Sequence, residues 1–152
     1  MGRDLRHMDA RGVIEALGLG YLTGEGCWVS LIWRTEDASA IYALITPEDF
    51  SAMHRLDEDE AWTYIAGDPA EIVVLHPDGS HQLVTLGIDI AAGQVPHFRV
   101  PRGCWQGTLT LGQWTLVSCV LVPPFTKFEL ATEATDLELW SDAQPAIAAR
   151  MR

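Results

Sequence analysis

Four side chains suited to acid–base or ligand-binding chemistry lie close together in the chain: His54, Glu60, Trp62 and Tyr64. If residues 60–65 form a β-strand, alternation of side chains puts Glu60, Trp62 and Tyr64 on one face. A carboxylate flanked by two amphipathic aromatic residues is typical of a cavity wall that holds a partly polar ligand. A solvent-exposed face with aromatic cross-strand pairs has the same pattern, so both interpretations stay open.

His54 precedes Glu60 by six positions, and the acidic residues 57–59 between them indicate a solvated turn. The two side chains could therefore face each other across a hairpin. An imidazole beside a carboxylate can act as a proton shuttle or share a metal ion. A lone histidine can equally be an ordinary hydrogen-bonded residue.

Bulk composition limits the classes of protein to consider. The 152 residues, 48% of them hydrophobic, predict one domain with a substantial core, and a formal net charge of -11 argues against binding nucleic acid or anionic membranes. The longest apolar stretch, 114–122, is too short to span a membrane. Residues 1–9 lack an apolar secretion core, and three widely spaced cysteines indicate reduced thiols, so we expect a cytoplasmic protein.

The elements that would position these side chains are mainly strands. Asp9 and Gly18 could cap a short N-terminal helix over residues 9–17. Short apolar or alternating runs follow, separated by Pro- and Gly-containing turns, and this pattern favours an all-β closed barrel or two-sheet sandwich. The predicted strands are 27–33, 41–45, 60–65, 71–75, 82–86, 98–100, 108–111 and 114–122. Residues 132–152 are predicted to form a C-terminal appendage, in which Pro145 could begin a short helix.

Several blocks in order resemble the cupin superfamily, and within it the DUF985 or Cupin_5 family, over about residues 17–131. The blocks are Phe50–Asp57, Asp59–Trp62, Ala66–Pro69, His76–Gly79, Leu86–Gly87, Val100–Gln106 and Leu116–Cys119. The resemblance implies a jelly-roll β-barrel, commonly dimeric, with its site at the open end of the barrel. We therefore expect a homodimer that binds a small molecule inside the barrel.

The resemblance also assigns positions to the metal ligands of the wider superfamily. His54 and Glu60 match two of these ligands, but Leu56 and Gln106 stand where the other two are histidines. Leucine has no donor atom and glutamine is a weak ligand, so we expect no tightly bound metal and no cofactor. His54, Glu60 and Gln106 would then remain as polar groups in an aromatic cavity.

A second departure concerns the segment Glu25–Arg34. Ser30 and Leu31 stand where the family usually carries a charged pair, and Trp28 and Trp33 are added. If this strand lines the mouth of the barrel, Trp28 and Ser30 would contact a ligand that is more hydrophobic or larger than a nucleotide sugar. The tryptophans could instead pack between the sheets or in a dimer interface.

The resemblance leads to three functional hypotheses. In a metal-independent enzyme, His54 would be the base, Tyr64 the acid, Glu60 the group that orients the imidazole, and Gln106 a donor to a carbonyl or enolate oxygen. Isomerisation, epimerisation, dehydration or cyclisation would all suit such a site.

In the second hypothesis, Trp62, Tyr64 and Trp105 hold a ligand without catalysis. The third, a metal-dependent oxygenase or lyase, would need ligands supplied by His97, Cys104 or Cys119. No motif places a histidine beside Cys104 or Cys119, so nucleophilic catalysis is not expected.

Overall fold

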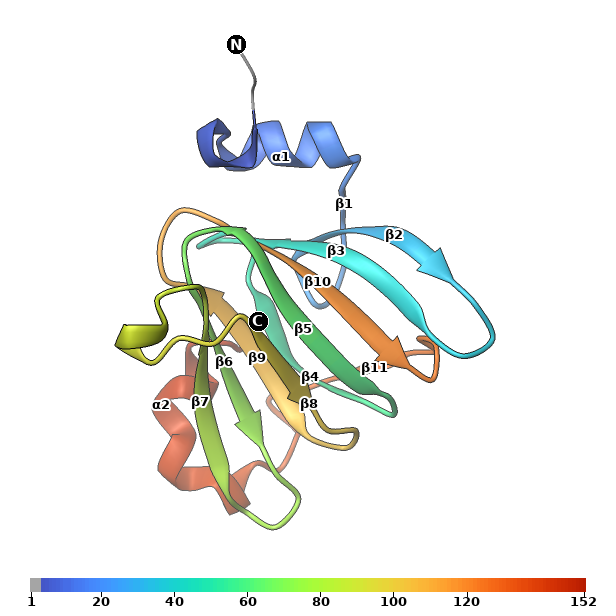
Figure 1. The fold of residues 1–152 in the computed structure, drawn as a ribbon. Coiled ribbons are helices and arrows are strands. Elements are labelled where there is room, and N and C mark those ends of the chain that lie inside the picture. Colours follow the sequence, from blue (N-terminus) through green and yellow to red (C-terminus); the bar gives the residue numbers. More distant parts are fainter. Residues whose placement is uncertain (1–3) are drawn as a thin grey trace.

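The protein is described by a computed structural model of residues 4–152, in which two antiparallel sheets face each other (Figure 1). The six-stranded sheet has the order β1-β2-β3-β10-β5-β8, and the five-stranded sheet has the order β11-β4-β9-β6-β7. This is the expected all-β jelly roll. The strands are β1 (Gly20–Tyr21), β2 (Trp28–Arg34), β3 (Ser39–Ile45), β4 (Ser51–Leu56), β5 (Asp59–Gly67), β6 (Ala70–Leu75), β7 (His81–Leu86), β8 (His97–Val100), β9 (Trp105–Thr110), β10 (Thr115–Val122) and β11 (Phe128–Leu130).

The helices are few and short. They are α1 (Ala10–Leu17), α2 (Gln144–Ala148) and three 3-10 helices, Leu5–His7, Ile90–Ala92 and Glu138–Ala143. As predicted, the Asp9 side chain accepts from the Gly12 N–H at the start of α1, and Gly18 ends it with a φ of 63°. In residues 4–152, no helix combines the length and apolar character required to cross a membrane.

The strand that carries His54 was not predicted as a strand, and it belongs to the opposite sheet from Glu60. β4 pairs with β9 and β11, whereas β5 pairs with β10 and β8. The hairpin hypothesis for His54 and Glu60 is therefore wrong, because the turn between β4 and β5 crosses from one sheet to the other. The acidic turn is also only partly solvated, since Glu58 is buried and accepts from the backbone N–H and hydroxyl of Thr126.

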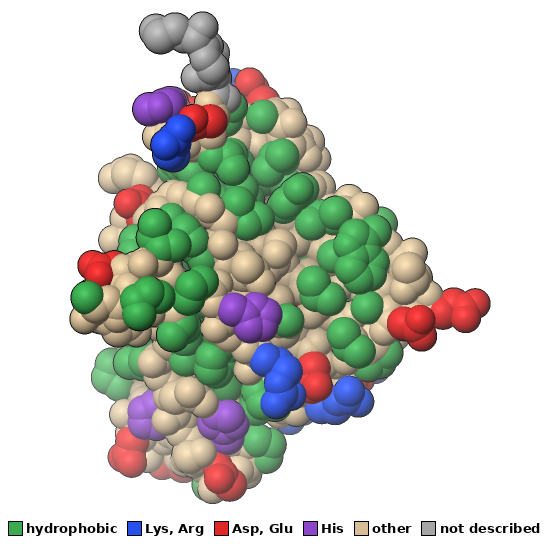
Figure 2. All heavy atoms as spheres, in the orientation of Figure 1, with side chains coloured by type: hydrophobic (Ala, Val, Ile, Leu, Met, Phe, Trp, Pro, Cys, Tyr) green, Lys and Arg blue, Asp and Glu red, His purple; other side chains and the backbone are tan. Residues whose placement is uncertain are grey.

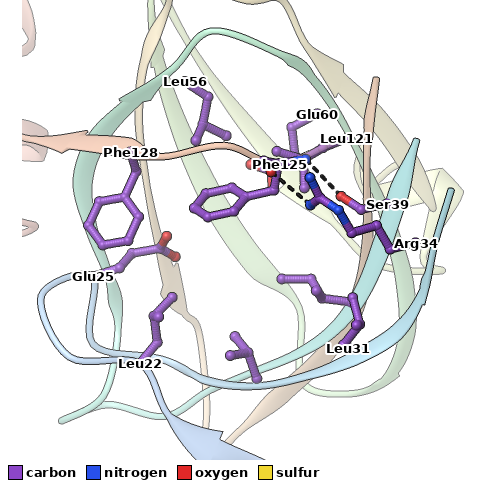
Figure 3. A pocket seen from close by; sticks show the side chains of 12 residues that line it. Leu22, Glu25, Leu31, Arg34, Ser39, Leu56, Glu60, Leu121, Phe125 and Phe128 are labelled. Atoms are coloured by element: carbon purple, nitrogen blue, oxygen red, sulfur yellow. Dashed lines mark hydrogen bonds between the residues drawn. The ribbon is translucent and has the colours of Figure 1, made fainter. Parts of the chain in front are cut away.

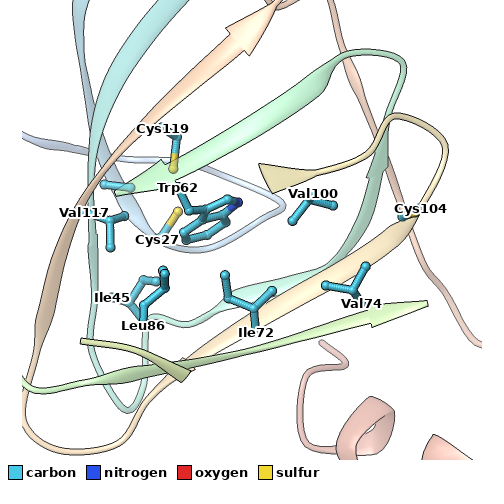
Figure 4. Packing of buried hydrophobic residues seen from close by; sticks show 11 residues of the cluster. Cys27, Ile45, Trp62, Ile72, Val74, Leu86, Val100, Cys104, Val117 and Cys119 are labelled. Atoms are coloured by element: carbon cyan, nitrogen blue, oxygen red, sulfur yellow. The ribbon is translucent and has the colours of Figure 1, made fainter. Parts of the chain in front are cut away.

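The main core lies between the two sheets (Figure 4). Inward-facing residues of both sheets form it, and burial of their apolar surface is the main force that holds the sheets together. The buried members are Cys27, Ala43, Ile45, Trp62, Ile72, Val74, Leu86, Val100, Cys104, Val117 and Cys119. The three cysteines are free thiols, as expected.

The C-terminal appendage covers the outer face of the five-stranded sheet (Figure 1). Trp140 and Ile147 pack against Trp105 and Val73 in a second apolar cluster. Pro145 lies at the start of α2, as predicted. Arg150 is only 1% exposed and its guanidinium donates to three backbone carbonyls and to the Glu71 carboxylate. This end of the chain is therefore an integral layer of the fold.

Apolar side chains also reach the surface. Figure 2 shows hydrophobic side chains distributed over the visible face, between scattered charged groups. The exposed large ones include Leu31, Trp33, Ile88 and Ile90.

Candidate functional site

A cavity of about 290 Å³ opens between the two sheets (Figure 3). Its wall is mostly hydrocarbon, and Glu25, Glu60, Arg34 and Ser39 are its polar members. The apolar lining residues are Leu22, Val29, Leu31, Ile41, Leu56, Leu121, Phe125 and Phe128. In Figure 3, Glu25 and Glu60 point toward this space from different sides. The volume is at the small end of the range for small-molecule pockets.

Glu60 is held in the cavity wall by two donors. Its Oε1 accepts from Trp62 Nε1 at 3.2 Å and from Gln106 Nε2 at 3.0 Å, while Trp62 Nε1 also lies 3.1 Å from Gln106 Oε1. Glu60 is 5% exposed, and this burial raises the pKa of its carboxyl from 4.5 to about 7. Nearby His54 opposes the rise and Glu25 adds to it. Both protonation states of Glu60 are consequently populated near neutral pH.

Glu25 is a site residue that sequence reasoning missed. It lies in the loop between β1 and β2, where a tight turn ends at Gly26 with a φ of 104°, and its backbone carbonyl accepts from Ala52 N of β4. The Glu25 carboxylate accepts from the Ser51 hydroxyl at 2.7 Å and from the Cys27 thiol at 3.2 Å through Oε2. The sequence feature that could have indicated Glu25 is its position at the start of the family segment Glu25–Arg34, which continues into β2.

His54 lies behind Glu25 and is not part of the cavity lining. Its Nδ1 is 2.7 Å from the Ala52 carbonyl oxygen, which can only accept, so Nδ1 carries a proton. Its Nε2 faces Glu25 Oε1 at 3.5 Å. The expectation that Glu60 orients the imidazole is therefore wrong, because Glu25 and the Ala52 carbonyl occupy the two ring nitrogens.

The segment between β10 and β11 forms one wall of the cavity. Phe125 N donates to Ser39 Oγ at 3.0 Å, and Arg34 Nη1 donates to the Phe125 carbonyl at 2.8 Å. Glu58 holds the next residue through Thr126 N and Oγ1. These contacts hold the backbone of this segment in place, and the Phe125 ring centroid is 6.3 Å from that of Phe128.

Tyr64, proposed as the acid, lies apart from this cavity. Its hydroxyl donates to the Gly67 carbonyl at 2.5 Å, and its ring lines a separate hollow beside Leu5 and Trp114. β5 does carry Glu60, Trp62 and Tyr64 on one face, but the strand is long enough to place its two ends in different environments. The proposed partnership of Tyr64 with His54 is therefore wrong.

Three predicted ligand contacts also face elsewhere. Trp28 donates to Asp49 and packs in the cluster beneath α1. Ser30 lies on the same face of β2 as Trp28, whereas Val29 and Leu31, on the opposite face, line the cavity. Trp105 packs under the C-terminal layer, with the Arg55 guanidinium 4.6 Å above its ring. Trp28 and Trp105 therefore have packing roles, which is the alternative left open for Trp28.

The donor set does not fit the metal centre of the wider superfamily. Leu56 presents only hydrocarbon to the cavity, and the Gln106 amide is engaged with Glu60 and Trp62. Within residues 4–152, no three His, Cys, Asp or Glu side chains are arranged to hold a metal ion. His97 and Cys104 do not join the site, since His97 contacts Thr63 and Cys104 contacts His76.

A histidine lies beside Cys104 in the structure, although no sequence motif places one there. Its Sγ is 3.5 Å from His76 Nδ1, and His76 Nε2 is 2.7 Å from Gln82 Oε1. Burial raises the pKa of the Cys104 thiol, so the contact does not produce the thiolate required of a nucleophile.

Residues 12–131 match the family described as Cupin superfamily (DUF985). The chain belongs to this family of cupins. A protein of known structure from Shewanella oneidensis is similar, with 31% identity and a TM-score of 0.88, covering 95% of this chain and 98% of that one. A hypothetical protein from Leishmania major is 27% identical with a TM-score of 0.86, covering 95% and 99%.

More distant structures share the cupin fold alone. They include a mutant oxalate decarboxylase from Bacillus subtilis, which is 14% identical with a TM-score of 0.62, covering 84% of this chain and 34% of that one. The DMSP lyase from Ruegeria pomeroyi is 15% identical with a TM-score of 0.59, covering 78% and 58%. No curated protein matches the chain in sequence.

Proposed function

We propose that this cupin binds a small, mainly apolar metabolite and that Glu60 exchanges a proton with it. The observation that carries the proposal is a carboxyl in the cavity wall with a pKa of about 7. A general acid–base group works best when its pKa lies near the operating pH. Perturbed carboxyls in clefts are also typical of functional sites.

Glu60 suits this role better than His54 for geometric reasons. Trp62 and Gln106 both donate to Oε1, and the Cys119 thiol packs against the carboxyl, which lies in the cavity wall. His54 does not line the cavity, and its Nε2 faces Glu25 Oε1. The hydrocarbon wall limits access of water, which strengthens electrostatic interactions at the carboxyl.

Glu25 provides a second group for proton movement. It lines the same cavity from a different side and faces His54 Nε2, so it is placed to exchange a second proton with a bound substrate. In the reaction with a carbonyl compound, the Glu60 carboxylate takes the proton from the α-carbon, the C–H electron pair forms the C=C bond of the enolate, and the C=O π pair moves onto oxygen. Return of a proton from the Glu60 carboxyl to carbon then restores the carbonyl and the carboxylate. Isomerisation, epimerisation, dehydration and cyclisation all use such a step, without a metal ion or cofactor in this scheme.

Deuterium exchange tests the proposal whichever product the protein forms. The protein is incubated in deuterium oxide with a panel of small alkyl and aryl ketones and aldehydes, and mass spectrometry follows exchange at the α-carbon. We expect the wild type to exchange at least one compound faster than buffer without protein does. Glu60→Gln should exchange the same compound at least 100-fold more slowly than the wild type. Glu36→Gln, an exposed change in the β2–β3 turn, is the matched control.

Two results would count against the proposal in different ways. Equal exchange by wild type and Glu60→Gln would remove Glu60 from the chemistry. Compounds that bind in the cavity but never exchange would favour the alternative, a ligand-binding cupin without catalysis, which the mostly apolar lining also suits.

A further inference from the structure

The cavity has an uneven distribution of charge. Two carboxyl groups, Glu25 and Glu60, line it, and the one cationic side chain in the lining, Arg34, is exposed and already donates to the Phe125 carbonyl. The Glu25 side chain is 13% exposed and Glu60 is 5% exposed. A ligand that enters the cavity therefore meets the carboxylate oxygens of Glu25 and Glu60 in its buried part, and the single cationic group, Arg34, at its exposed part. An anionic group, such as a phosphate or carboxylate, would be repelled from the inner part.

The two carboxyls are only partly compensated by the protein. His54 Nε2 is 3.5 Å from Glu25 Oε1, which is longer than a good charge-assisted hydrogen bond. The donors to Glu25 are a hydroxyl and a thiol, and those to Glu60 are an indole, an amide and the Cys119 thiol, all of them neutral. A buried carboxylate with neutral donors gains most from a cation that arrives with the ligand.

The rest of the cavity wall favours a ligand with a hydrocarbon part. Eight of the twelve lining residues are aliphatic or phenylalanine, and the rings of Phe125 and Phe128 lie within 6.3 Å of each other. A cation near an aromatic face gains further electrostatic attraction. A cavity of about 290 Å³ leaves room for a compact molecule, at the lower limit of drug-sized ligands.

From these observations we propose that the ligand is a small apolar amine, with its ammonium group seated between Glu25 and Glu60 and its hydrocarbon part against the leucine and phenylalanine wall. The inference rests on the proposed function, since it adds an ammonium group to the carbonyl compound proposed as the substrate of the same cavity. It adds that Glu25 is a specificity-determining residue, which selects amines over alcohols and acids of equal size.

The binding should depend on pH through the ionisation of Glu60. The titratable groups that face Glu60 are His54 from β4, Glu25 and Cys27 from the β1–β2 region, and Cys119 from β10. Both thiols have a pKa raised well above its ordinary value and stay neutral. With a Glu60 pKa of about 7, amine affinity should rise up to about tenfold from pH 6 to pH 8.

Three probes of nearly equal size test the inference: 2-phenylethylamine, 2-phenylethanol and phenylacetate. Calorimetric titration of the full chain at pH 8 should show the amine binding at least tenfold more tightly than the alcohol, with the acid weakest. Glu25→Gln and Glu60→Gln should each reduce amine affinity at least tenfold while leaving alcohol affinity within about threefold. Glu36→Gln should change none of the three affinities.

Each other outcome overturns the inference. Equal or tighter binding of the alcohol or the acid would refute it, as would failure of the amine to bind at all. Circular dichroism of each variant checks folding, and Glu25→Asp, which keeps the charge, should retain part of the amine preference. Deuterium exchange of a neutral ketone that requires Glu60 would then show that the proposed function stands although the ligand is not an amine.

Discussion

Replacing Glu60 by Gln should make the protein more stable at alkaline pH. The substitution keeps an acceptor oxygen for Trp62 and Gln106 and removes the ionisable group. The pKa of Glu60 is about 7 in the folded protein against an ordinary value of 4.5, so its carboxyl binds a proton more tightly when folded. The stability that this group contributes is therefore fully present below about pH 4.5 and is lost as pH rises through 7.

The size of the effect follows from the shift. A rise of the pKa from 4.5 to about 7, at about 1.4 kcal/mol per pH unit, corresponds to about 3.5 kcal/mol of unfolding free energy over the whole titration, of which about 3 kcal/mol falls between pH 4.5 and pH 8. The difference in unfolding free energy, Glu60→Gln minus wild type, should therefore increase by about 3 kcal/mol between pH 4.5 and pH 8. Groups with lowered pKa, such as Asp59, titrate in both proteins and cancel in this difference.

Urea denaturation followed by tryptophan fluorescence measures both free energies across this pH range. Glu36→Gln is again the matched control, and its difference from wild type should stay flat, because Glu36 is exposed. A flat Glu60→Gln difference curve, or one that falls as pH rises, would refute the assignment of a raised pKa to Glu60.

Further variants test the supporting structure. Arg150→Ala should lower the unfolding free energy by about 3–5 kcal/mol in urea denaturation, because three carbonyls and Glu71 lose a buried donor. A loss under about 1 kcal/mol would show that the Arg150 contacts of the C-terminal layer are not needed for stability. Gly67→Ala should cost about 2 kcal/mol or more, since Gly67 has a φ of 90° and a Cβ there would collide with the Trp114 carbonyl; an unchanged Tm would contradict this. Tyr64→Phe should leave deuterium exchange within twofold of wild type, because the Tyr64 hydroxyl bonds to Gly67 outside the cavity, and a large loss would restore Tyr64 as a catalytic residue.

The fold was accessible from the sequence because its signals are local. Caps such as Asp9 and Gly18, and turns containing proline and glycine, mark the ends of elements wherever they occur. β4 was missed because residues 51–56 mix a histidine and an arginine with apolar residues, although most of the strand is buried. A buried histidine and its loop neighbours do not give the alternating pattern that predicts a strand.

The site was only partly accessible, because its key contacts join segments distant in sequence. The spacing of His54 and Glu60 singled out two groups that the structure brings near each other, although not across a hairpin, and the family pattern added Gln106, which donates to Glu60 across the barrel. Glu25 contacts His54 because of the turn before β2, and a turn has no periodic sequence pattern from which this contact could be predicted. Which face of β2 points inward depends on the pairing of β2 with β3, so Trp28 was assigned to the wrong side.

The most direct test of the central claim is the titration of Glu60 itself. Carbon-13 NMR of protein labelled at the glutamate side-chain carboxyl follows each carboxyl from about pH 3 to about pH 9, and the resonance missing from Glu60→Gln identifies Glu60. We expect a midpoint near 7 for this resonance. A midpoint between about 4 and 5, the ordinary glutamate range, would show that Glu60 is fully ionised at neutral pH and would contradict its role as a proton-transfer group.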